Sequence, residues 1–220
     1  MNLASNSQGG VQLGLWESIM DLLMIKPVFF LGIFVVIVLL LILGKNKSAV
    51  SKVRIILVSF ILYYYLYLLF GNIVGVPTLS ELFRLSRLKE AVFNPNINLI
   101  PFSDGLSLSF ILNIVLFVPL GFLCPILSRT YQSAKADILS GFFLSLFIEI
   151  SQLFTLYRAT DINDLITNIL GAVVGYLCFN LIVKLKVVKR IDNKRSVEKD
   201  SLAYMPLFIM IISFGCVFFG

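Results

Sequence analysis

The sequence contains no histidine, and this absence excludes several kinds of site. A Ser-His-Asp triad cannot form, nor can a zinc site with histidine ligands. Cysteine is scarce as well. Cys124, Cys178 and Cys216 each stand alone in apolar sequence, without the spacing of a metal site or of a disulfide framework. We interpret them as buried apolar side chains and expect no cofactor and no bound metal.

Charge is also scarce. Only 14% of the 220 residues are charged, whereas 59% are hydrophobic and the mean hydropathy is +0.97. Soluble domains average roughly 45–50% apolar residues, so this composition indicates an integral membrane protein. Basic residues outnumber acidic ones by 18 to 12. Because they gather in loops between apolar runs, we expect membrane lipids as partners and no nucleic acid.

Six apolar runs each approach the roughly 20 residues needed to cross a hydrocarbon core. A backbone within lipid must satisfy its own hydrogen bonds, so each run is expected to be a helix. The predicted fold class is all-α, a polytopic membrane helix bundle with about six transmembrane helices. The predicted crossings are Pro27–Leu43, Val53–Gly75, Ser107–Leu127, Ala136–Tyr157, Ile162–Val183 and Ala203–Phe219.

The loops predict an orientation in the cell membrane. Those after the first, third and fifth runs hold most of the Lys and Arg, which places them in the cytoplasm and both termini outside. In the long outer loop, Thr78–Val92 has apolar residues at helical spacing and predicts an interfacial or re-entrant helix. Asn94–Phe102, with its prolines and asparagines, predicts a fixed non-helical stretch.

These observations divide the chain into five parts. They are a tail with an interfacial helix (residues 1–26), a first crossing with a basic loop (27–52), a four-helix core (53–183), a basic cytoplasmic loop (184–202) and a last crossing (203–220).

The stretch from Glu149 to Gly175 concentrates polar groups at membrane depth. Ionisable groups in a bilayer are costly, so they usually mark a site or a paired network. From the rise of a helix, Glu149, Asn168 and Asn113 lie roughly 9–12 Å below the outer ends of three separate crossings. We therefore predict one polar cluster beneath the outer surface. Its predicted members are Asn98, Pro101, Asn113, Glu149, Gln152, Arg158, Asp161, Asp164 and Asn168.

Most of these groups also have a purely structural interpretation, which stays open. Asp161 and Asp164 can cap the helix that follows them. Asn113 and Asn168 can hydrogen-bond across helices. The small residues expected to let helices pack closely are Gly121, Gly171 and Gly175.

An ordered set of motifs runs through the core. It comprises Asn98–Phe102 (NLIPF), Asn113–Phe122 (NIVLFVPLGF), Glu149–Phe154 (EISQLF) and the polar stretch from Arg158 to Gly175. Together these motifs resemble the VanZ-like membrane family, although Tyr157 stands where a glycine is usual. The resemblance implies a role in the bacterial envelope. The family takes its name from a protein that lowers susceptibility to teicoplanin, a lipid-tailed glycopeptide antibiotic.

Three classes of function stay open. The first is a non-enzymatic protein whose outer pocket binds a lipoglycopeptide or a cell-wall lipid. The second is a membrane enzyme acting on a lipid or its headgroup, with Glu149 as general acid or base and a divalent cation at Asp161, Asp164 and Asn168. The third is a structural or assembly factor. We favour the first, because no nucleophile motif accompanies Glu149.

Overall fold

The structure is a computed structural model that describes residues 25–43, 49–93, 95–101, 108–155, 159–185 and 201–220. The described part is all-α, as predicted, apart from a pair of two-residue strands, β1 (Ile97–Asn98) and β2 (Thr160–Asp161). The helices are α2 (Val28–Leu43), α3 (Ala49–Leu68), α4 (Leu79–Leu88), α5 (Leu108–Leu127), α6 (Ala134–Gln152), α7 (Ile162–Lys184) and α8 (Met205–Phe219).

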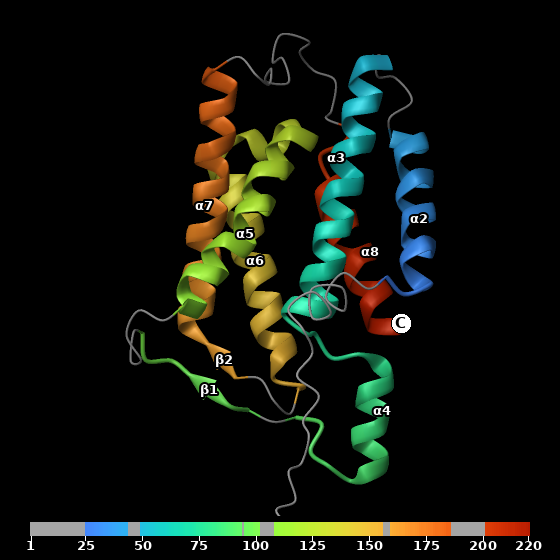
Figure 1. The fold of residues 1–220 in the computed structure, drawn as a ribbon, viewed down its shortest axis with the longest axis vertical. Helices are drawn as coiled ribbons and strands as arrows, with labels where there is room; N and C mark the ends of the chain where they lie inside the picture. The colour runs from blue at the N-terminus through green and yellow to red at the C-terminus, as the bar shows by residue number, and fades with distance from the viewer. Residues whose placement is uncertain (1–24, 44–48, 94, 102–107, 156–158, 186–200) are drawn as a thin grey trace, which may run out of the picture.

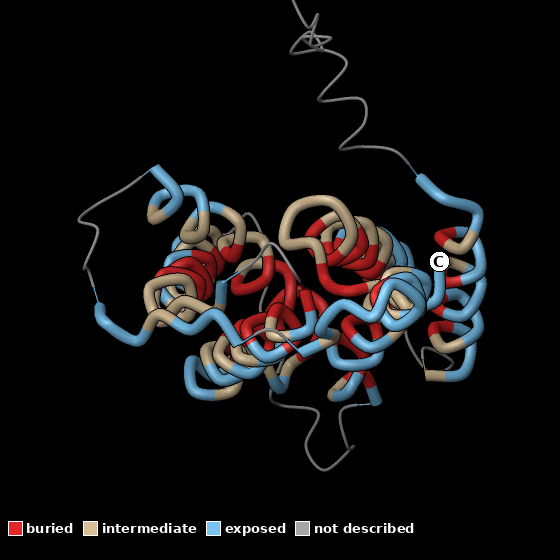
Figure 2. The backbone as a smooth tube through the Cα atoms, turned by 90° about the horizontal axis from the view of Figure 1, so that it is seen from below, coloured by how far each residue is buried: buried red, intermediate tan, exposed pale blue. Residues whose placement is uncertain are grey.

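The long helices run side by side along the long axis of the molecule (Figure 1). The α4 helix, both strands and the C-terminus lie at one end of this bundle, which we call the strand end. At the opposite end, a 3-10 turn, η2 (Arg129–Gln132), connects α5 to α6; we call this the turn end. Buried residues gather in the centre of the bundle and exposed ones lie outside (Figure 2).

The outer faces of the helices are apolar, as lipid contact requires. On α7, the exposed residues Leu170, Val174, Leu177 and Leu181 recur every three or four positions and form one stripe. Among the described residues, Lys52–Ile73, Leu108–Leu127 and Ile162–Lys184 are long and apolar enough to cross a membrane, and α2 and α8 are shorter apolar helices. The count of six crossings stays a prediction.

Three predicted helices differ from the observed ones at their ends. The run predicted to end at Tyr157 ends as α6 at Gln152, followed by a turn. The second run continues from α3 into a π-helical turn, η1 (Leu69–Ile73). The helix predicted over Thr78–Val92 is observed as the shorter α4, capped by the Thr78 hydroxyl and ended by left-handed Lys89 at φ 57°.

Helices α5 and α7 form the most closely packed pair, and glycines make this packing possible. A Cβ atom on Gly171 would collide with the carbonyl oxygen of Ile114 in α5, and one on Gly175 with that of Val118. From the other side, a Cβ on Gly121 would collide with the backbone of Ala172 in α7. The two helices therefore touch backbone to backbone over about two turns, which fixes the polar residues they carry.

Candidate functional site

A cavity of about 200 Å³ lies between α5, α6, α7 and the end of the η1 turn. We call it the polar cavity. Half of its lining residues are polar and half are apolar. The polar ones are Ser109, Asn113, Glu149, Gln152, Asp164 and Asn168, and the apolar ones are Ile73, Val74, Leu112, Leu116, Phe117 and Ile148.

Glu149 is buried in the wall of the polar cavity, with 3% of its surface exposed. Its Oε2 atom accepts a hydrogen bond from the backbone N–H of Asp161 at 2.9 Å. The Thr160 hydroxyl also donates to the backbone carbonyl of Glu149, at 2.9 Å. Glu149 thus lines the cavity and also holds β2 against the end of α6, through its side chain and through its backbone carbonyl. A buried hydrogen bond of this kind contributes about 0.5–1.5 kcal/mol.

Two side-chain hydrogen bonds join the three helices around the cavity. Asn113 Nδ2 of α5 donates to Asp164 Oδ1 of α7 at 2.6 Å. Asn168 Nδ2 of α7 donates to Ser145 Oγ of α6 at 2.9 Å. The three residues predicted to lie at one depth, Asn113, Glu149 and Asn168, therefore line the same cavity, and the hydrogen bonds of Asn113 and Asn168 join α7 to α5 and to α6.

Gln152 lies one helical turn beyond Glu149 on α6 and is 5% exposed. Its Oε1 atom is buried and has no hydrogen-bond partner in the part of the chain that the structure describes. A buried polar atom left without a partner costs about 1–3 kcal/mol. The wall of the cavity therefore contains a hydrogen-bond acceptor that a donor could satisfy.

Other predicted site residues lie outside the cavity lining. Asp161 caps α7, since its Oδ1 accepts from the N–H of Asn163 at 2.8 Å. Its Oδ2 accepts from Asn98 Nδ2 at 3.4 Å, across the parallel β1–β2 pair. Pro101 is exposed beyond β1. Arg158 falls outside the described residues. Asn98 and Asp161 thus stabilise the N-terminal end of α7, which lies beside the cavity.

The sequence of residues 4–183 matches the protein family described as VanZ/LLP1. The chain belongs to the VanZ/LLP1 family. The match covers the helices from α2 to α7, including every residue of the polar cavity, and it leaves α8 outside. No curated protein and no solved structure matches the chain.

Sequence reasoning missed several residues of this VanZ/LLP1 site. Ser145 precedes Glu149 by one helical turn, so helical spacing could have identified it. Ser109 precedes Asn113 by the same step. Ile73 and Val74 carried no signal, because an irregular turn brings them to the cavity. Asp137 was also missed. It is fully buried in α6 outside the cavity lining, and neither carboxylate oxygen has a hydrogen-bond partner among the described residues.

The divalent cation of the enzyme hypothesis finds no support in the positions of the acidic side chains. Asp161 is directed to the start of α7 and to Asn98, whereas Asp164 is directed to Asn113. Within the described ranges, no three His, Cys, Asp or Glu residues are grouped as ligands of a metal ion.

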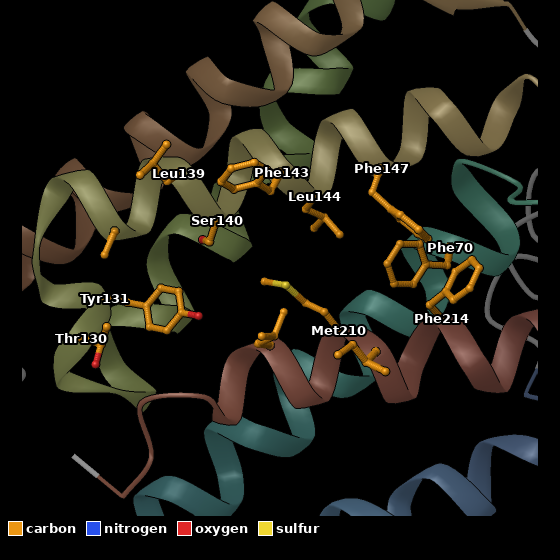
Figure 3. Close-up of a pocket in the computed structure, with 13 residues that line it drawn as sticks. Phe70, Thr130, Tyr131, Leu139, Ser140, Phe143, Leu144, Phe147, Met210 and Phe214 are labelled. Carbon is orange, nitrogen blue, oxygen red and sulfur yellow. The ribbon is translucent and has the colours of Figure 1, made fainter. Parts of the chain in front are cut away.

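A second cavity of about 550 Å³ lies between α6 and α8 and shares no lining residue with the polar cavity (Figure 3). We call it the apolar cavity. Among the described lining residues, Thr130, Tyr131 and Ser140 carry hydroxyl groups and the others are apolar. None of these described residues is acidic or basic, so the lining suits a hydrocarbon ligand.

Proposed function

We propose that this VanZ/LLP1 protein binds an amphiphile, such as a lipoglycopeptide or a cell-wall lipid, in the polar cavity. The observation that carries the proposal is the divided lining of that cavity. Apolar side chains of η1 and α5 can contact a lipid tail, while the acidic and amide side chains of α5, α6 and α7 can contact a headgroup. Lower teicoplanin susceptibility of the cell is the corresponding physiological role.

The polar wall is richest in acceptors, which favours a ligand that donates hydrogen bonds. Glu149 is acceptor-only when ionised, and Gln152 Oε1 has no described partner. One of the two N–H donors of Asn113 is used by Asp164, and one of those of Asn168 by Ser145. Hydroxyl, amide or ammonium groups of a headgroup would donate hydrogen bonds to these acceptors.

A structural or assembly role is the second candidate, because the same Asn113–Asp164 and Asn168–Ser145 hydrogen bonds can act only to hold helices together. Its prediction differs from that of a binding site. Variants of a purely structural network lose protein abundance and activity in parallel, whereas variants of a binding site lose activity at normal abundance.

We further propose that the strand end faces outward, with both termini on that side. The support is the concentration of basic residues in the sequence between α2 and α3, between α5 and α6 and after α7, since the described helix ends next to these segments lie at the turn end. A membrane-impermeant thiol reagent should then label Glu90→Cys in intact cells but not Ser133→Cys, and the opposite pattern would reject this orientation. Both positions are exposed.

Site-specific photo-crosslinking tests the binding proposal. A photoreactive amino acid replaces Leu116, which lines the polar cavity, or its neighbour Val115, which is 58% exposed on the outer face of α5. In cells, position 116 should capture one amphiphile saturably, and added lipoglycopeptide or cell-wall lipid should compete. Position 115 should capture bulk phospholipid without competition.

Two results would argue against the proposal. If both positions capture the same phospholipids in the same proportions, the cavity does not select an amphiphile. If position 116 captures only segments of the protein itself, the cavity is a packing defect within the bundle, and the structural role is favoured.

A further inference from the structure

The apolar cavity has the depth of one membrane leaflet. The α6 residues that line it, from Ala136 to Phe147, recur at steps of three, one, three, one and three and so form a single face of the helix. At the rise of an α-helix this face is about 16 Å long. That length is about half of a hydrocarbon core of roughly 30 Å. The opposite wall is formed by α8, with Met210 at its centre (Figure 3).

The two ends of the apolar cavity differ in chemistry. At the turn end it begins beside the hydroxyl-bearing residues Thr130 and Tyr131, which directly follow Arg129 in the chain; Lys135 directly precedes the first lining residue of α6. Lys135 is exposed and Arg129 is half-buried. A hydroxyl and cation pair at a membrane surface suits the phosphate and ester groups of an anionic lipid.

The other end is closed by three aromatic rings, those of Phe70, Phe147 and Phe214 (Figure 3). The rings of Phe147 and Phe214 meet edge to face at 4.8 Å between centroids, and those of Phe70 and Phe214 at 5.9 Å. These contacts are favourable arrangements for aromatic pairs, so the closed end is well packed. We call the three rings the aromatic floor.

We propose that the apolar cavity is a second lipid site, distinct from the polar cavity, and that it holds one acyl chain of an anionic phospholipid. Arg129 and Lys135 contact the phosphate, Thr130 and Tyr131 lie beside the ester groups, and the chain extends along α6 to the aromatic floor. The gradient from basic to hydroxyl to hydrocarbon reproduces the order of groups in a phospholipid. The aromatic floor limits the length of the acyl chain that fits.

Native mass spectrometry of the full chain, released from nanodiscs of defined phospholipids, tests this site. The wild-type protein should retain phosphatidylglycerol about tenfold or more over phosphatidylcholine of the same chains, because each basic residue near the headgroup adds about 1 kcal/mol for an anionic lipid. Replacing Arg129 and Lys135 together by Gln should remove this preference. Equal retention of the two lipids by the wild-type protein would overturn the proposal.

A cavity-filling variant tests the position of the acyl chain. Ser140→Leu places methyl groups inside the cavity and should reduce retained phosphatidylglycerol about tenfold, since each buried methylene it displaces is worth about fourfold in affinity. Ala134→Leu, at an exposed position of α6 outside the lining, is the matched control. Unchanged retention by a folded Ser140→Leu protein would place the lipid elsewhere and overturn the proposal.

Varying acyl length tests the aromatic floor. Phe214→Ala should shift the most strongly retained phosphatidylglycerol toward longer chains. Phe218→Ala is the control, because Phe218 stacks on Phe214 at 5.5 Å but does not line the cavity. A shift with Phe218→Ala equal to that with Phe214→Ala would reject the floor as the element that limits chain length.

Discussion

Glu149→Gln is expected to weaken ligand capture at the polar cavity strongly, together with any teicoplanin protection, while the protein remains in the membrane at nearly wild-type abundance. Glutamine has the same shape and keeps an oxygen that can accept the Asp161 N–H bond now made by Oε2. What it loses is the second carboxyl oxygen, which becomes an NH2 group and can no longer accept a hydrogen bond from the ligand. A buried donor left without its acceptor costs about 1–3 kcal/mol, so affinity should fall about fivefold to a hundredfold.

Glu149→Ala should lose binding to the same extent and should also lose stability. The N–H of Asp161 would be left without its acceptor, and β2 would be held against α6 only by the hydrogen bond from the Thr160 hydroxyl to the backbone carbonyl of residue 149. The expected cost is about 1–3 kcal/mol. For a chain of this size that corresponds to a fall in Tm of roughly 2–12 °C. Comparing the two variants therefore separates the ligand role of the carboxylate from its structural role.

Ile150→Ala is the matched control for both variants, because Ile150 follows Glu149 on the same helix but is 49% exposed on the outer face. Binding is measured by cross-linking from position 116, and abundance by quantitative immunoblot. If Glu149→Gln captures as much ligand as the wild-type protein, the side chain of Glu149 is not part of the ligand site. A parallel loss of capture and abundance would favour a structural role, and turnover of a lipid that Glu149→Gln suppresses would favour an enzyme.

Gly171→Leu is expected to prevent accumulation of the folded protein. A Cβ at this position already meets the carbonyl oxygen of Ile114 and lies 2.8 Å from the Cβ of Phe117. Both obstacles sit on α5 and one is backbone, so neither can rotate away. Overpacking of this kind costs about 1–3 kcal/mol or more, and the larger side chain increases the cost.

Gly171→Ala provides the graded measurement and should lower the Tm of the purified protein by roughly 2–12 °C. Gly215 of α8 supplies the control, since a Cβ there would have no atom within 4 Å. Gly215→Leu and Gly215→Ala should behave like the wild-type protein. If Gly171→Leu accumulates as well as Gly215→Leu does, the backbone contact between α5 and α7 is not what holds the cavity together.

The helices could be predicted because hydrophobic runs and backbone hydrogen bonding act locally. The predicted crossing Pro27–Leu43 is observed as α2 from Val28 to Leu43, and Ser107–Leu127 as α5 from Leu108 to Leu127. The end of α6 was placed five residues too late, since Leu153–Tyr157 continues the apolar run. Composition alone could not show that the chain turns after Gln152 to bring Thr160 back to Glu149.

The polar cavity could be predicted in part. Depth from the helical rise and facing from the helical period predict that Asn113, Glu149, Asp164 and Asn168 lie close together, since both depend on the geometry of single helices. In the structure all four line the polar cavity. For Asp161 the sequence leaves a place in the cluster and a cap of the following helix both open, and the structure shows the cap. Its contact with Asn98 depends on a two-residue strand pair between distant segments, which has no local signal.

The apolar cavity could not be predicted at all. Its lining residues resemble every other lipid-facing or buried apolar residue of a membrane helix. It lies between α6 and α8, so its presence depends on how these two helices pack, which is a property of tertiary structure. Tyr131 and Phe214 carry no pattern that distinguishes them before the structure is known.

Polar side chains of α5, α6 and α7 meet in one cavity within the bundle. This arrangement can be tested by cross-linking Asn113→Cys to Asp164→Cys in a chain whose native cysteines are replaced by Ala. The 2.6 Å bond between these side chains predicts rapid coupling by a short thiol cross-linker in native membranes. Ile111→Cys, 58% exposed on α5, should not couple to Asp164→Cys. Equal coupling of both pairs, or coupling of neither, would contradict the account.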